Sequence, residues 1–130
     1  MDYKAKFATE GTYTPDGLIA GNAHLLVARK VTIKSGANLA RGAVLGAITA
    51  EGADKGKYKL SASGASDGSQ TPDLVLAEPA TAADADVVAL AYERGDFAAN
   101  AITLGAGHTI ASVREGLRAK GVTILPAVAA

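Results

Sequence analysis

The chain has 130 residues, with 13 Lys and Arg, 13 Asp and Glu, and no cysteine. This length fits one domain, the zero formal charge gives no basis for electrostatic capture of nucleic acid or anionic membranes, and the lack of thiols excludes disulfides and cysteine chemistry. There is no Trp and only two Phe, so the core must be built from small aliphatic side chains. Such a chain would gain stability by burying more surface against copies of itself.

The charges are unevenly divided along the chain. Residues 1–60 carry nine Lys and Arg against five Asp and Glu, whereas residues 61–130 carry four against eight. The simplest interpretation is variation along a solvated surface. The alternative is that oppositely charged faces meet between subunits.

Residues 1–17 are polar but carry Tyr3, Phe7 and Tyr13, half of the six aromatic residues in the chain. Two interpretations stay open, a frayed terminus and an arm that becomes ordered on a partner. No apolar segment follows Met1 as in a signal peptide, and no apolar run reaches the roughly 18–20 residues that cross a bilayer. We therefore expect a soluble protein made in the cytoplasm.

The first half of the body is expected to be made of short strands. Strands are predicted at residues 24–32 and 58–60, with a turn at 34–38 between the first of them and the next segment. Residues 39–49 form an apolar run that glycines break into bent pieces. Residues 61–71 are rich in Ser and Gly and predict a mobile surface loop within one domain.

The second half is organised around residues 73–104. The apolar runs 74–76 and 87–92 are short enough to be strands, and Pro72 and Pro79 bound the first because proline cannot donate to a ladder. Arg94-Gly95-Asp96 is predicted to end the second run as a turn.

The clearest helix is predicted at residues 109–120, followed by a closing strand at 122–125 that ends at Pro126. Thr109 suits an N-cap and Gly121 a C′ position. Three apolar residues share one helix face, and we expect them to face the core: Ile110, Val113 and Leu117. Gly116 weakens the middle of the helix but would let another backbone approach.

No residue pattern predicts catalysis, a cofactor or a metal. His24 and His108 are far apart and have no carboxylate at metal-ligand spacing, so they are expected to be structural. Asp84 and Asp86 are typical of an acidic loop. Gly105 and Gly107 precede the helix but lack the motif of a phosphate-binding loop, which favours a simple helix entry.

Taken in order, the segments resemble the head decoration protein family of tailed bacteriophages, the lambda-type capsid-stabilising proteins. The resemblance rests on residues 39–49, 56–58, 74–77, 82–90, 94–102 and 109–121. It implies a mainly β single domain of the β-clip type, a barrel or sandwich with one or two short helices, and a homotrimer. It implies a non-enzymatic virion protein without cofactors that sits on the outer capsid surface.

The resemblance also implies a function and partners. The trimer would bind three-fold and quasi-three-fold sites of the expanded capsid and stabilise it against internal DNA pressure, with the major capsid protein as partner. Residues 1–17 would be the capsid-binding arm and residues 18–130 the decoration domain. The arm residues expected to contact the capsid are Tyr3, Phe7, Thr12, Tyr13, Thr14 and Pro15.

Two alternatives remain at this stage. A trimeric β-clip enzyme of the nucleotide-hydrolase type would need convergent carboxylates, which Asp84, Asp86 and Asp96 do not obviously supply. A host-surface adhesin would use Arg94-Gly95-Asp96, which matches the integrin-binding tripeptide, although a turn between charged residues needs no receptor to explain it.

Overall fold

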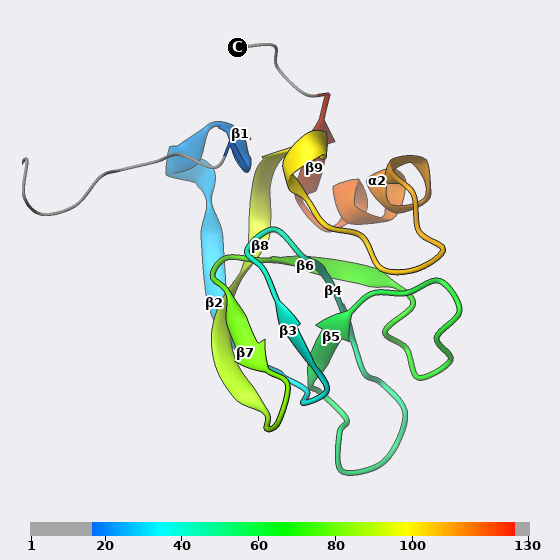
Figure 1. The fold of residues 1–130 in the computed structure, drawn as a ribbon. Coiled ribbons are helices and arrows are strands. Elements are labelled where there is room, and N and C mark those ends of the chain that lie inside the picture. Colours follow the sequence, from blue (N-terminus) through cyan, green and yellow to red (C-terminus); the bar gives the residue numbers. More distant parts are fainter. Residues whose placement is uncertain (1–16, 127–130) are drawn as a thin grey trace, which may run out of the picture.

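The computed structural model describes residues 17–126, in which the long strand β8 (Val87–Ala98) pairs with four other strands (Figure 1). The described part is mainly β with one α-helix, which confirms the predicted class. Its other elements are β1 (Ile19–Gly21), β2 (Val27–Ile33), β3 (Ala37–Leu39), β4 (Val44–Ala47), β5 (Tyr58–Leu60), β6 (Pro72–Leu76), β7 (Ala80–Ala82), the helix α2 (Ile110–Ala119), β9 (Val122–Leu125) and the 3-10 turns η1 (Ala23–Leu25) and η2 (Ala99–Ala101).

Five strands close into a small barrel in the order β8, β2, β5, β4, β6 and back to β8. All of these pairs are antiparallel except β2–β5, which are parallel and joined only at Ile33 and Tyr58. Closure removes the open edges that a flat sheet would expose. The β4–β6 ladder shifts register between Leu45 and Gly46, which bends the run where the sequence predicted a break.

Alternation along the barrel strands sends one set of side chains inward. In β6, Leu74 and Leu76 point into the barrel while Val75 points out, and Leu45 and Val44 of β4 divide in the same way. The interior cluster consists of Val31, Ile33, Ala43, Leu45, Tyr58, Leu74, Leu76, Ala80, Ala82, Ala89 and Ala91. Alanines line part of it because five strands leave little room inside.

A second cluster lies outside the barrel, where α2 and β9 cover β4 and β6 at the upper right of Figure 1. Its buried members are Leu18, Val44, Val75, Phe97, Val113, Leu117, Val122 and Ile124. The helix face predicted from sequence is confirmed, since Val113 and Leu117 are fully buried here and Ile110 packs against them.

The short ribbon β3–β7 lies at the end of the barrel where β2 ends and β8 begins (Figure 1). Its Ala80 and Ala82 belong to the interior cluster, so the ribbon closes this end. Val27 pairs with Arg94 at the opposite end of the β2–β8 ladder. We call that opposite end the barrel mouth.

Several predicted boundaries are corrected by the structure. The strand expected at residues 24–32 begins only at Val27, because His24 lies in η1. The predicted turn at residues 34–38 is partly strand, since β3 begins at Ala37. The turn expected at residues 94–96 does not form, and β8 continues to Ala98 because β1 and β9 pair with its second half. No described atom lies within 4 Å of a Cβ built on Gly116, so the predicted close approach at this glycine is wrong within the protomer.

Candidate functional site

The six residues predicted to contact a capsid lie outside the described residues. They are Tyr3, Phe7, Thr12, Tyr13, Thr14 and Pro15. The described chain begins at Gly17, and the next residue is held against β8. Leu18 is fully buried, and its carbonyl oxygen accepts a 2.8 Å hydrogen bond from the backbone N–H of Ala98. Strand β1 follows as an edge strand on β8.

The barrel mouth holds a polar hollow of about 370 Å³. Its lining residues come from β2, β6, β8 and the end of α2, and they are Val27, Arg29, Asp73, Leu74, Glu93, Arg94 and Lys120. Three cationic side chains thus meet two carboxylates at one end of the barrel. A site with this lining suits a charged group of a partner better than an apolar ligand.

Most of these charges are already paired. The Arg29 guanidinium donates to the Tyr58 hydroxyl and lies 3.5 Å from a Glu93 carboxylate oxygen, while the Lys120 ammonium lies 3.2 Å from an oxygen of Asp73. Burial and the neighbouring Asp73 raise the pKa of the Tyr58 hydroxyl, which therefore stays protonated and donates to Asp73 at 3.1 Å. Among the described residues, the side chain of Arg94 makes no hydrogen bond or ion pair.

A second surface lies on the outer side of β2 and β8, opposite the interior cluster. Val88 and Leu90 point outward and are 67% and 40% exposed, although both are large apolar residues in a regular strand. Their partners across the ladder are Thr32 and Lys30. The helix α2 packs against β9 and β6, so it does not cover this side of the barrel within residues 17–126.

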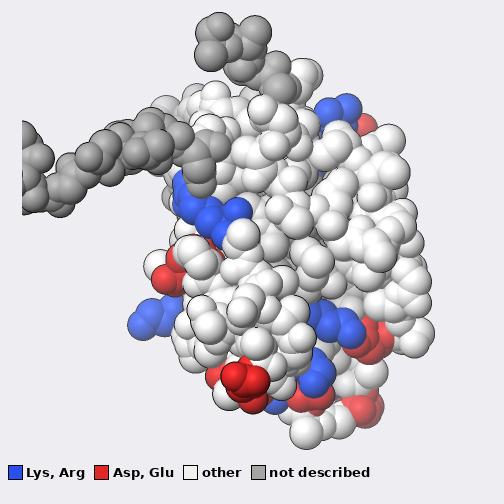
Figure 2. Space-filling model, viewed as in Figure 1, with Lys and Arg blue, Asp and Glu red and all other residues white. Residues whose placement is uncertain are grey.

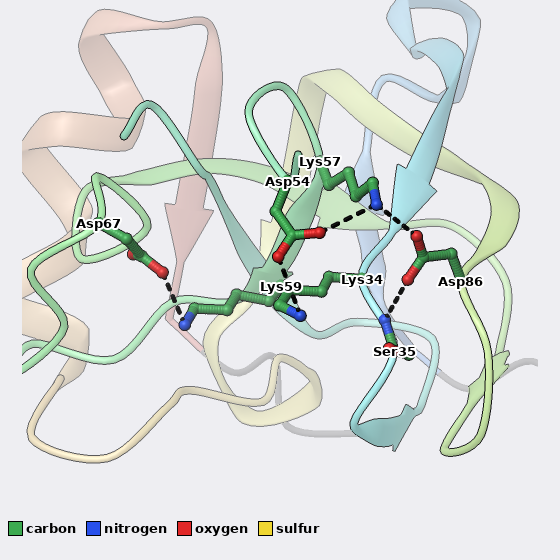
Figure 3. A network of polar contacts seen from close by, with 7 residues as sticks. All are labelled: Lys34, Ser35, Asp54, Lys57, Lys59, Asp67 and Asp86. Carbon is green, nitrogen blue, oxygen red and sulfur yellow. Dashed lines mark hydrogen bonds and ion pairs between the residues drawn. The ribbon is translucent and has the colours of Figure 1, made fainter. Parts of the chain in front are cut away.

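Charged residues gather at the β3–β7 end of the barrel, at the bottom of Figure 2. Figure 3 shows a chain of contacts there, in which the Lys57 ammonium lies 2.6 Å from Asp86 and 3.0 Å from Asp54. Asp54 also pairs with Lys34 at 3.2 Å, and Asp86 accepts from the backbone N–H of Ser35 at 2.7 Å. The network ties the loop after β4 to the end of β2 and to the turn before β8.

These contacts favour the charged forms. Lys57 and then Lys34 lower the pKa of Asp54, and Lys57 and then the Ser35 amide lower that of Asp86. Asp86 and then Asp54 raise the pKa of Lys57. Full ionisation with opposite partners is typical of a structural clamp, since a catalytic pair of carboxylates needs one group held neutral.

The Ser- and Gly-rich loop at residues 61–71 contains no strand or helix, but buried side chains, an ion pair and hydrogen bonds hold it against the rest of the domain. Ser61 and Ser69 are fully buried. Lys59 pairs with Asp67 at 2.8 Å, and Asp67 accepts from the backbone N–H and the hydroxyl of Ser69. Lys59 and then Ser69 hold the pKa of Asp67 far below its usual range. No local pattern in the sequence predicts that these two serines are buried.

The tripeptide Arg94-Gly95-Asp96 is part of β8 and does not project as a turn. Gly95 has φ +156°, a backbone conformation that residues with a side chain rarely adopt, and a Cβ at this residue would lie 2.5 Å from Leu26 Cδ2, so the Leu26 side chain would have to move. Asp96 accepts a 2.8 Å hydrogen bond from the side chain of Asn22. This geometry gives no support to the adhesin alternative.

The remaining polar candidates also serve structural contacts. His108 joins the loop to α2, since its Nε2 lies 2.9 Å from the Gln70 carbonyl oxygen and its Nδ1 3.0 Å from the Ser112 hydroxyl. A Cβ on Gly105 would overlap the Ser61 carbonyl, so this glycine allows two segments to touch and is not part of a phosphate cradle.

The carboxylates that an enzyme would need are held apart. Asp86 is bound by Lys57 and Ser35 at the start of β8, Asp96 is held by Asn22 near the other end, and Asp84 is exposed in a turn. Within residues 17–126, no group of three His, Cys, Asp or Glu side chains is placed to hold a metal ion. No helix in the same range is long and apolar enough to span a membrane.

Comparison with known protein families gives one match that covers most of the chain. The family described as "Bacteriophage lambda head decoration protein D" matches residues 7–122. The match includes strands β1 to β8 and the helix α2, and it ends at Val122, the first residue of β9. No curated protein matches the chain.

Proposed function

This chain belongs to the family of the bacteriophage lambda head decoration protein D, and we propose that it acts as a homotrimeric cement on the phage head. Membership makes it a structural protein of the virion that is associated with the capsid. The proposal adds that the trimer, built from β-clip protomers, occupies three-fold and quasi-three-fold sites on the outer surface of the expanded shell. There it stabilises the capsid against internal DNA pressure, after synthesis in the host cytoplasm.

The proposal assigns the contact with the major capsid protein to residues 1–17. The family match is the observation that carries the proposal as a whole. The burial of Leu18 supports this division, because a firm anchor directly after the arm lets the body hold it in place. The aromatic residues Tyr3, Phe7 and Tyr13 are the proposed anchors, together with Thr12, Thr14 and Pro15.

Stabilisation would arise from linkage. A trimer that binds the expanded shell and not its precursor stabilises the expanded state by mass action. Each arm residue that becomes ordered costs about 1–2 kcal/mol of conformational entropy, so a single arm would bind weakly. Three arms on one trimer act at a high effective concentration, and the whole trimer would then bind tightly.

Deletion of residues 1–17 tests the proposal. We expect the truncated protein to keep its fold and its trimeric mass in light scattering, and to lose co-sedimentation with undecorated expanded capsids. Full-length protein with Tyr3, Phe7 and Tyr13 all changed to Ala should show the same loss, whereas Glu51→Ala, which alters an exposed side chain on the body, should bind normally. Full binding by the truncated protein would refute the role of the arm.

A further inference from the structure

We infer that copies of this chain meet head to tail, with the barrel mouth of one copy against the outer side of β2 and β8 of the next. This inference rests on the proposed homotrimer and names the surfaces that would form it. The mouth surface consists of Leu25, Val27 and Arg94. The side surface consists of Val88 and Leu90, with Asp84 in the turn that leads into β8.

The apolar residues are the first support. In the described part of the chain, the exposed large hydrophobic residues are Leu25 (51%), Val27 (38%), Val88 (67%) and Leu90 (40%). They form two groups along one strand ladder, since Val27 pairs with Arg94 at one end, just after Leu25 in η1, and Val88 pairs with Thr32 near the other. A ring needs two different surfaces on each copy, because every subunit touches one neighbour with each of them.

The charges are the second support. The side chains of Arg94, on the mouth surface, and Asp84, before the side surface, make no hydrogen bond or ion pair among the described residues. The side also carries the exposed cation Lys30, which stands opposite Leu90, and the mouth carries Glu93, whose side chain is 43% exposed. Each surface therefore carries charges of both signs, although Glu93 also lies near Arg29 and the Glu78 carboxylate accepts from the Leu90 N–H. Arg94 against Arg94 would repel, whereas Arg94 against Asp84 would attract.

The packing of the barrel explains why these residues remain exposed. Val88 and Leu90 alternate with Ala89 and Ala91, which fill the interior, so their own side chains must point outward. The helix α2 covers β4 and β6 on another side and does not reach them. An apolar strand face that the described part of its own chain leaves exposed is a typical place for a subunit contact.

Solution mass by light scattering, at one protomer concentration, tests the contact. Val88→Asp should lower the mass from three protomers to one, and the control Ala111→Asp, which adds the same charge to the exposed start of α2, should not. Arg94→Glu and Asp84→Arg should each raise the dissociation constant by at least about tenfold, because each places like charges together. The double variant that carries both Arg94→Glu and Asp84→Arg should regain most of the affinity lost in the single variants, because opposite charges face each other again. Circular dichroism checks that every variant is folded.

The outcomes separate this inference from the proposed function. An oligomeric wild type whose mass is unchanged by Val88→Asp and by both charge reversals would overturn the contact and leave the homotrimer standing. A wild type that is monomeric at every accessible concentration would overturn the homotrimer and the contact with it. Loss of capsid binding after arm deletion bears on neither result, since no residue of the arm is assigned to either surface.

Discussion

Two glycines provide a sharp test of the packing, because the same substitution should have opposite effects at the two sites. Gly95 lies in the middle of β8 with φ +156°, where an added Cβ would lie 2.5 Å from Leu26 Cδ2 and 2.9 Å from Phe97 Cζ. Gly116 lies within α2, and nothing is within 4 Å of its Cβ position. We expect Gly95→Ala to destabilise the protein and Gly116→Ala to stabilise it.

The magnitudes follow from the contacts. Overpacking costs typically about 1–3 kcal/mol, and a side chain in a sparsely populated backbone region costs about as much again. Alanine also lowers the conformational entropy of the unfolded chain, which stabilises the folded protein by about 0.4–1 kcal/mol. The net loss in the free energy of unfolding at Gly95 should be about 2–4 kcal/mol. At Gly116 the gain should be about 0.5–1 kcal/mol, the ordinary difference between glycine and alanine within a helix.

Urea unfolding followed by far-UV circular dichroism gives both values. The protomer concentration has to be the same for all variants, since the stability of an oligomer depends on it. A Gly95→Ala variant as stable as the wild type would refute the close packing of β8 against Leu26. A Gly116→Ala variant that loses stability would show that the outer side of α2 is covered.

Three further predictions concern a cap, a core residue and acid stability. Thr109→Ala should cost about 1 kcal/mol in urea unfolding, because the Thr109 hydroxyl accepts from the Ser112 N–H at 3.2 Å, and an unchanged midpoint would exclude this capping box. Leu117→Ala should cost about 2–5 kcal/mol, since the side chain is fully buried, and a loss under 1 kcal/mol would contradict a tightly packed second cluster. The Asp67 contribution to stability is complete above its ordinary pKa of 3.8 and falls as the pH drops below that value toward the lowered pKa of the folded state. Acid titration of Asp67→Asn should therefore show a smaller loss of stability below pH 3.8 than the wild type, and equal losses would show that Lys59 and Ser69 do not favour the carboxylate.

Local signals along the chain were enough to predict several of the elements. The helix was predicted from apolar spacing, the cap at Thr109 and the glycine at 121, and its buried face was correct. Strands β5 and β9 were found at their true bounds, because short apolar runs beside turn residues or a proline leave few other structures. The family resemblance also came from the order of such segments and is confirmed by the match over residues 7–122.

The tertiary structure alone decided how these elements combine. The closure of the barrel depends on β8 pairing with both β2 and β6, and no local signal encodes a contact between distant strands. Arg94-Gly95-Asp96 has the composition of a turn, yet β1 and β9 hold it as strand, and Leu26, which is far away in sequence, explains the glycine. Ser61 and Ser69 belong to a segment with the composition of a linker but are buried. In each case the outcome depends on partners brought together by folding, and a pattern read along the chain cannot contain them.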